Sequence, residues 1–278
     1  MKKLISIYTF LLFILLCPYD LFAQTADALK LKETGNNFYL EGNYDKAEEY
    51  YLKAIKADIA YAPAYNNLGN IYLKQNSFVK AINYFSKAIE NNNTDPAFYI
   101  NRAFAYEKTN ENKLALSDYN YAIQLSGDND EYYRKRGLFH TGTSNFDKAI
   151  SDFNKAILLN PENAENYYHR GIAKLSSRDN MEGQEDLIIA ANAGNEKAQK
   201  IIAEVLFPQV ENSEYLALCL KAALKYKLNK YPEAIIDLDK AISMNPKAAK
   251  PYLLRGLSKI QQKNMNSGCK DLKTARSK

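Results

Sequence analysis

The sequence predicts an all-α protein, an α-solenoid of about seven helix-turn-helix repeats that is interrupted by one extra helix. Three observations support this prediction. Small residues recur every 34 residues, large apolar residues keep a fixed distance from them, and the apolar pattern between them is that of amphipathic helices. A two-helix unit of this length cannot bury its own apolar face, so neighbouring units must stack.

Three series of small residues and one series of large residues define the repeat. The first small series is Ala54, Ala88, Ala122, Ala156, Ala190, Ala241 and Ala275. The second lies seven residues earlier, at Ala47, Ala81, Ala115, Ala149, Gly183, Ala234 and Gly268. The third is Gly35, Gly69, Ala103, Gly137, Gly171, Ala222 and Gly256, and the large series is Tyr51, Phe85, Tyr119, Phe153, Leu187, Leu238 and Leu272. We expect two helices, A and B, to cross closely at the small residues, with a large side chain filling the space beside each.

One step in the series is 51 residues, which is 34 plus 17. The additional residues include an apolar pattern from Ala198 to Leu206 that predicts one more helix, ended by Phe207-Pro208. We therefore expect a five-repeat array over residues 28–206 and two further repeats over 211–278. The alternative is an insertion that the stack absorbs without a break.

This small-large layout resembles the tetratricopeptide repeat family over nearly all of residues 28–275. The fourth repeat carries the signature positions of the family at Tyr133, Arg136, Gly137, His140, Ala149, Phe153, Ala156 and Pro161. The resemblance implies a right-handed solenoid. Gly183 and Gly268 depart from the pattern, which has alanine there, and we expect each to weaken its helix by about 1 kcal/mol. The proline that closes each repeat is found only at Pro161 and Pro246.

A cation and an aspartate occur together in the repeats from the third onward. The seventh position of the repeat holds Thr34, Leu68, Arg102, Arg136, Arg170, Lys221 and Arg255, and the twenty-third holds Tyr50, Tyr84, Asp118, Asp152, Asp186, Asp237 and Asp271. Because these positions lie on the two helices of one hairpin, we predict half-buried, bidentate ion pairs within each repeat. The alternative is that the arginines of successive repeats bind an acidic ligand.

Residues 1–23 have the layout of a secretory signal peptide. Lys2 and Lys3 precede an apolar run over residues 4–16, and Ala23 precedes Gln24 at the expected cleavage site. The run is shorter than the roughly 20 residues of a membrane-spanning helix. We expect export to the periplasm or the outside of a bacterium. A retained anchor and lipidation at Cys17 are the alternatives, and they are the only membrane contact that we expect.

No pattern in the sequence predicts catalysis, a cofactor or a metal. His140 and His169 lie in different repeats with no cysteine or acid at metal-ligand spacing, and no phosphate loop or nucleophile elbow is found. The expected export argues against a nucleic-acid partner. Cys219 and Cys269 are expected to be free thiols packed as small hydrophobic residues.

The family resemblance implies that the A helices line a concave groove in which a peptide or a partner helix lies. By position, the groove residues are Lys32, Asn36, Tyr39, Asn66, Asn67, Asn70, Lys74, Ile100, Asn101, Phe104, Lys108, Arg134, Lys135, Leu138, Tyr168, His169 and Ile172. We call the face that they form the groove face. A carboxylate clamp known in the family is incomplete, because Lys32, Asn36 and Asn67 fit it whereas Ala97 and Asn101 lack the charge it requires.

These observations predict a protein–protein interaction scaffold without enzymatic activity. Asparagine amides can bond to a peptide backbone, and aromatic side chains offer rigid contact area. The alternative function is a ligand-binding or sensory module that recognises a small acidic ligand or a glycan.

Overall fold

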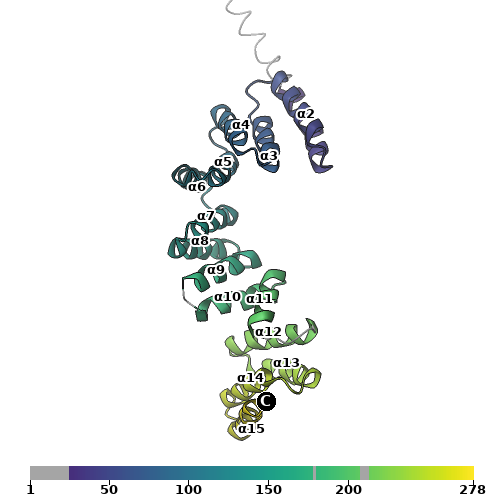
Figure 1. Ribbon diagram of the computed structural model, residues 1–278, viewed down its shortest axis with the longest axis vertical. Helices are drawn as coiled ribbons and strands as arrows, with labels where there is room; N and C mark the ends of the chain where they lie inside the picture. Colours follow the sequence, from purple (N-terminus) through teal and green to yellow (C-terminus); the bar gives the residue numbers. More distant parts are fainter. Residues whose placement is uncertain (1–24, 178–179, 207–212) are drawn as a thin grey trace, which may run out of the picture. The chain divides into compact units, whose positions relative to one another are not determined.

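The computed structural model describes residues 25–177, 180–206 and 213–278, which form helices joined by short turns (Figure 1). A first helix covers residues 25–40. It is followed by α2 (Tyr44–Ala57), α3 (Ala62–Lys74), α4 (Phe78–Asn91), α5 (Pro96–Lys108), α6 (Asn112–Ser126), α7 (Asp130–Gly142), α8 (Phe146–Leu159), α9 (Ala164–Ser176), α10 (Asn180–Asn192), α11 (Glu196–Leu206), α12 (Ser213–Lys227), α13 (Tyr231–Met244), α14 (Ala249–Gln261) and α15 (Met265–Arg276). The predicted all-α helical repeat fold is confirmed.

The helices pair into hairpins, and α11 is the extra helix that the 51-residue step predicts. The turns inside six hairpins each contain a residue with positive φ. These residues are Gly42, Asn76, Asn110, Ser144, Asn229 and Lys263. Glycine and asparagine tolerate this left-handed conformation better than other residues, which is why they recur where the chain reverses between helices A and B.

The small and large residues meet across each hairpin as expected. A Cβ atom placed on Gly69 would lie 2.4 Å from Cε1 of Phe85, and one placed on Gly35 would lie 2.6 Å from Cε1 of Tyr51. Both aromatic rings are buried. The glycines therefore set how closely helix A approaches helix B, and the rings fill the space that the missing side chains leave.

Gly183 and Gly268 also have a packing role. A Cβ atom on Gly183 would lie 2.9 Å from the carbonyl oxygen of Gly171, and one on Gly268 would lie 2.8 Å from that of Gly256. Each glycine faces a second glycine at the helix crossing, so the usual alanine would not fit there. Glycine lowers the helix propensity at these two positions, and it also lets the backbones of the two helices of each hairpin approach more closely.

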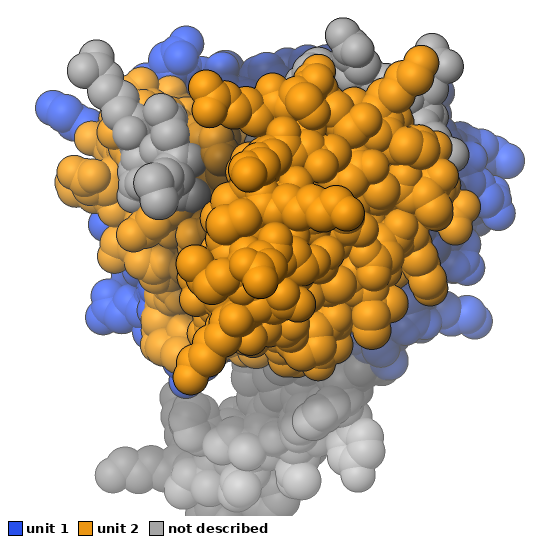
Figure 2. Space-filling view, turned by 90° about the horizontal axis from the view of Figure 1, so that it is seen from below, with its two compact units in different colours: residues 1–135 blue, residues 136–278 orange. Residues whose placement is uncertain are grey.

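Contacts between residues divide the chain into two compact units, one up to Lys135 and one from Arg136 onward, shown in two colours in Figure 2. The boundary between the units falls inside α7. The boundary that the sequence predicts between the two arrays falls in residues 207–212, outside the described residues, and stays a prediction.

Within the second unit, the extra helix shares a core with the helices on both sides of it. Ile202 of α11 is buried with Leu187 of α10 and Leu220 of α12. The side-chain amide of Asn192 donates to the backbone oxygen of Leu220 over 3.3 Å, and Lys227 of α12 forms an ion pair with Glu185 of α10. Helix α12 therefore packs on α10 as well as on α13.

The expected signal peptide, residues 1–23, lies outside the described residues. Among the helices that the structure describes, none combines the length and the apolar character needed to cross a bilayer. Both remaining cysteines are free, but only Cys219 is buried. Cys269 is exposed, so the expectation that both thiols are packed is wrong for Cys269, which lies on the outer side of α15.

Candidate partner-binding site

Four asparagine side chains form a hydrogen-bonded ladder across three A helices of the first unit. Asn101 of α5 donates to Asn66 over 2.9 Å, and Asn67 of α3 donates to Asn36 of the first helix over 2.8 Å. Asn66 and Asn67 are joined by a longer contact of 3.5 Å. The ladder fixes the register of neighbouring A helices and aligns amide groups along the groove face.

The ladder ends at a tyrosine of the first repeat. The hydroxyl of Tyr51 donates to Oδ1 of Asn36 over 2.8 Å, so this oxygen accepts two hydrogen bonds. In the second repeat the residues at the same positions are Phe85 and Asn70. Phe85 has no hydroxyl to donate, so Asn70 lacks the bond that holds Asn36.

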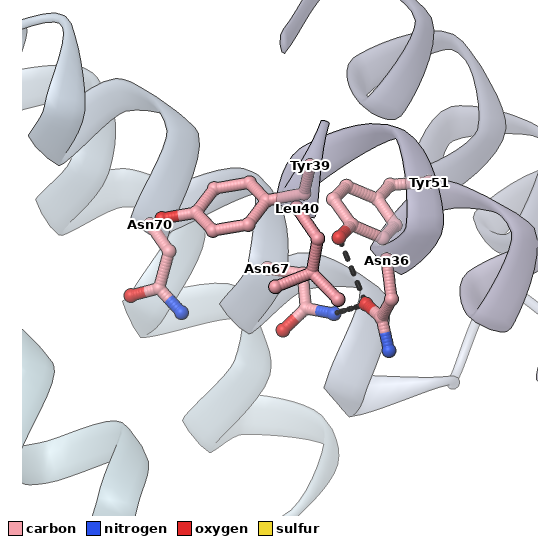
Figure 3. A pocket seen from close by; sticks show the side chains of 6 residues that line it. All are labelled: Asn36, Tyr39, Leu40, Tyr51, Asn67 and Asn70. Carbon is pink, nitrogen blue, oxygen red and sulfur yellow. Dashed lines mark hydrogen bonds between the residues drawn. The ribbon is translucent and has the colours of Figure 1, made fainter. Parts of the chain in front are cut away.

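A pocket of about 300 Å³ opens between the first two repeats (Figure 3). Its lining residues are Asn36, Tyr39, Leu40, Tyr51, Asn67 and Asn70. Figure 3 shows the ring of Tyr39 extending from the first helix toward Asn70 of α3. The side chain of Leu40 is 82% exposed at this site. Two aromatic rings and one aliphatic side chain therefore face three amides across the pocket.

The pocket carries no formal charge. None of its lining residues is an aspartate, glutamate, histidine, lysine or arginine, and both tyrosine hydroxyls stay protonated at neutral pH. Burial raises the pKa of Tyr51 to about 12, although the hydrogen bond with Asn67 opposes the shift and nearby Tyr39 adds to it. Burial and the neighbouring Tyr44 also raise the pKa of Tyr39. The site therefore offers neutral hydrogen-bonding groups and apolar surface.

None of the other predicted groove residues of the first unit lines the pocket, and Ile100 is buried in the core. Phe104 of α5 is 40% exposed, and Nζ of Lys108 lies 4.8 Å from the centre of its ring. Lys135 pairs with Glu131 over 3.4 Å. Lys32 is half-buried and Lys74 is exposed, each one helical turn from an asparagine of the pocket.

Three predicted groove residues lie outside the lining of the pocket, namely Arg134, Tyr168 and His169. Arg134 has a buried Nε atom that finds no partner among the described residues. Tyr168 and His169 belong to the second unit, where their rings meet edge to face at 4.9 Å and His169 lies 3.2 Å from Glu165. The structure thus gathers Asn36, Tyr39, Asn67 and Asn70 at the pocket and connects Asn66 and Asn101 to them through the ladder. The other predicted groove residues do not line the pocket.

Sequence reasoning missed Leu40 and Tyr51 as site residues. Tyr51 belongs to the large series and was interpreted as core alone, yet its hydroxyl reaches the groove face. The signal was present, because Tyr51 and Asn36 occupy the same hairpin and tyrosine, unlike phenylalanine, needs a partner for its hydroxyl when buried.

The arginines and aspartates of the later repeats meet in bidentate pairs. In the fourth repeat, Nε and Nη2 of Arg136 bond to the two carboxylate oxygens of Asp152 over 2.9 and 2.6 Å. Matching pairs of bonds join Arg102 to Asp118, Arg170 to Asp186 and Arg255 to Asp271. All four aspartates are buried.

Arg102, Arg170 and Arg255 also reach back to the B helix of the preceding repeat. The third nitrogen, Nη1, bonds to Ser86 from Arg102, to Asn154 from Arg170 and to Asp239 from Arg255, over 3.1, 2.7 and 2.6 Å. Each partner lies 16 residues before its arginine, and each aspartate lies 16 residues after it. One guanidinium therefore joins its own hairpin to the previous one.

The sixth repeat departs from this arrangement. Asp237 bonds over 2.6 Å to Lys225, one turn beyond Lys221, which is exposed. The same place is taken by Lys174 beside Asp186 and by Lys259 beside Asp271. The predicted pairing of Lys221 with Asp237 is therefore wrong, because Lys225 supplies the counter-charge.

The first two repeats replace the ion pair with aromatic contacts. The ring of Tyr84 stacks on that of Tyr72 at 5.2 Å, and the ring of Tyr50 lies 5.3 Å from that of Phe38. Lysines cover these rings, with Nζ of Lys53 lying 4.6 Å from the centre of Tyr50. Cation–π contacts thus take the place of charged hydrogen bonds in these repeats.

Within the described ranges, no three side chains of histidine, cysteine, aspartate or glutamate gather closely enough to hold a metal ion. His140 is buried, with Nε2 lying 4.0 Å from Oδ2 of Asp152 and no partner for Nδ1. It occupies the place where Lys174 approaches Asp186 in the next repeat, so its contacts are those of a core residue.

Comparison with known proteins agrees with this geometry. A model described as tetratricopeptide repeat matches residues 62–95, and a second model of the same description matches residues 35–58, 131–163 and 215–248. No curated protein matches the chain.

Solved structures with a similar fold include tetratricopeptide repeat proteins. YrrB, described as having an unusual peptide-binding site, is 22% identical with a TM-score of 0.52, and the match covers 64% of this chain and 92% of YrrB. MamA is 25% identical with a TM-score of 0.53, covering 59% of this chain and 96% of MamA. A repeat protein from Parabacteroides merdae is 23% identical with a TM-score of 0.52, covering 91% and 93%.

Proposed function

Because this chain belongs to the tetratricopeptide repeat family, we propose that it is a non-enzymatic scaffold that holds an extended segment of a partner protein on the groove face of its first unit. The observation that carries this proposal is the asparagine ladder beside the pocket. It places several amide groups in one row along three neighbouring helices, at a surface that already contains exposed aromatic and aliphatic side chains.

The ladder leaves hydrogen-bonding capacity for a partner. An asparagine amide has two donor hydrogens and an acceptor oxygen, and a peptide backbone offers the complementary groups. Oδ1 of Asn36 is used twice, whereas its amide nitrogen has no bond within the described residues. Asn70 has no hydrogen bond to another described side chain. These groups can bond to a peptide regardless of its sequence.

Relatives of similar fold support a protein partner. YrrB is described as having a peptide-binding site, and the present chain shares its fold over 64% of its own length. The groups available on the groove face are those that suit a peptide, and we propose no cofactor, metal or nucleic acid as a ligand.

A small acidic ligand has less support. Such a ligand would need free cations, and the arginines considered for this role are engaged with aspartates. Nε, Nη1 and Nη2 of Arg170 are all bonded, to Asp186 and Asn154. A ligand would have to displace a buried carboxylate from each arginine to bind there.

We further propose that the chain works outside the cytoplasm of a bacterium. The support is the composition of residues 1–23, with two lysines, an apolar run and Ala23 before Gln24. In that setting a scaffold would organise exported proteins.

Site-specific photo-crosslinking in the cells that make the protein tests the proposed partner binding. A photoreactive residue at Leu40 lies on the groove face, and one at the similarly exposed Val79 of α4 lies on a B helix and serves as the control. We expect a crosslinked protein from position 40 that is absent from position 79. Equal crosslinking at both positions, or none from position 40, would contradict the proposal.

A further inference from the structure

We infer that the pocket beside Tyr51 selects the partner by taking one uncharged, apolar side chain, of the leucine, methionine or phenylalanine type, from an extended peptide segment. This inference rests on the proposed function and deepens it, because it names what the partner must present at one position. Backbone bonding to the ladder is independent of sequence, so selectivity has to come from a contact of this kind.

The dimensions and the walls of the pocket suit a single apolar side chain. Its volume of about 300 Å³ is at the lower end of the range of ligand sites. The rings of Tyr39 and Tyr51 and the side chain of Leu40 provide apolar surface. Leu40 is 82% exposed in the free protein, so an apolar occupant would remove it from water.

The charges around the pocket exclude a charged occupant. The six lining residues include no acid and no base, and burial keeps the phenol of Tyr51 protonated by raising its pKa to about 12. A lysine or glutamate side chain that entered would lose water without meeting a counter-charge among the six lining residues, which is costly. An apolar side chain has no such penalty.

The amide of Asn70 can position the backbone of the peptide residue whose side chain enters the pocket. This amide lines the pocket and has no hydrogen-bond partner among the described side chains, because Phe85 stands where Tyr51 stands in the first repeat. One amide group can donate to a peptide oxygen and accept from a peptide nitrogen at the same residue. The side chain of that residue then points toward the apolar walls opposite Asn70.

The test uses the full chain and a phage-displayed library of random peptides as the probe. Peptides selected on the wild type are synthesised with leucine, alanine, lysine or aspartate at each position, and their affinities are measured by fluorescence polarisation. We expect one position at which leucine binds about tenfold more tightly than alanine, and at which both charged residues bind more weakly than alanine.

A variant that places a negative charge in the pocket makes the test specific to this site. Asn70→Asp is isosteric and introduces a carboxylate into the pocket, so we expect the variant to prefer lysine over leucine at that position. Asn83→Asp is the matched control, because Asn83 is exposed on α4 of the same repeat. The control should keep the wild-type preference.

Two other results would overturn the inference in different ways. The selected peptides could bind equally well with charged or apolar residues at every position, in both the wild type and Asn70→Asp. That result would show that the pocket does not select the partner, and it would leave the scaffold proposal intact. A library that yields no binding peptide would contradict both the selecting pocket and the proposed binding of a peptide.

Discussion

Arg102 and Asp118 face each other across the third hairpin and share two parallel hydrogen bonds, of 2.7 Å from Nε to Oδ2 and 2.9 Å from Nη2 to Oδ1. Burial opposes the charge of Arg102, yet the bonds and the charge of Asp118 outweigh it and raise the arginine pKa. Asp118 is only 7% exposed, and Arg102 is the one cation paired with it in the described part of the chain.

Arg102→Leu is therefore expected to lower the free energy of unfolding by about 3–5 kcal/mol, because it leaves a buried carboxylate without its counter-charge. The double variant Arg102→Leu/Asp118→Leu should recover most of the loss. Urea denaturation of the three proteins measures this. If the single and double variants were equally unstable, the arginine would act through packing and not through the pair.

His140→Phe should make stability less sensitive to acid. Burial lowers the pKa of His140 below its ordinary value of 6.5, and Arg136 and Lys148 act in the same direction while Asp152 opposes them. The unfolded chain therefore binds the proton more readily. The stability that depends on a neutral His140 is fully present above about pH 6.5. It is lost as pH falls through the lowered pKa of His140 in the folded state.

Thermal unfolding between pH 8 and pH 5 measures this effect, with pH as the only variable. The wild type should lose more stability over this range than His140→Phe. At pH 8 the variant should be more stable by about 1 kcal/mol, since it removes the unpaired Nδ1 atom. Parallel pH profiles for the two proteins would show that His140 is not the titrating group.

Gly69→Ala should destabilise the second repeat by about 1–3 kcal/mol, because its Cβ atom would overlap the ring of Phe85. Gly142→Ala is the matched control: nothing lies within 4 Å of a Cβ atom at that helical position. Denaturant unfolding should show a loss for the first variant and none for the second. Adding Phe85→Leu to Gly69→Ala should restore part of the loss.

Phe85→Tyr should weaken peptide binding without lowering stability. The new hydroxyl would stand where that of Tyr51 stands in the first repeat and would bond to Asn70 as Tyr51 bonds to Asn36. Asn70 would then be less available to a partner. Affinity for a selected peptide should fall several-fold, with an unchanged unfolding midpoint. An unchanged affinity would show that Asn70 does not contact the peptide.

Export can be checked from the N-terminus of the protein recovered from a bacterial host. Cleavage after Ala23 should give a chain beginning Gln24-Thr25-Ala26, identified by intact mass and N-terminal sequencing. Leu11→Arg should interrupt the apolar run and leave the precursor uncleaved. A chain that begins with a lipid-modified Cys17 would replace this proposal with the lipidated alternative.

The sequence predicted the repeat well because the fold depends on spacing. A 16-residue separation across a hairpin places Arg136 opposite Asp152, although the same separation does not pair Lys221 with Asp237 in the sixth repeat. It did not predict the backward bonds of the arginines, because Ser86, Asn154 and Asp239 share no residue type. Only the geometry of stacked hairpins brings these positions within reach.

The site was predicted in part for a related reason. Helical periodicity placed Asn36 and Asn70 on one face, but the different roles of the two residues depend on Tyr51 and Phe85, which belong to the core series. Whether a core hydroxyl reaches the groove face depends on how closely Gly35 lets the helices cross. That distance is a property of packing and is not visible in a pattern of residue types.

The symmetric reach of the arginines, 16 residues backward and 16 forward, also bears on how such a chain can change in length over evolution. A duplicated or deleted block of 34 residues keeps each arginine facing the same two positions in its new neighbours, 16 residues before it and 16 after it. A block of 17 residues, such as the one that contains α11, shifts the backward partner by half a repeat. Whole repeats can therefore be gained or lost by recombination with their joints preserved, whereas a half repeat leaves a junction that other contacts, such as Lys227 with Glu185, must hold.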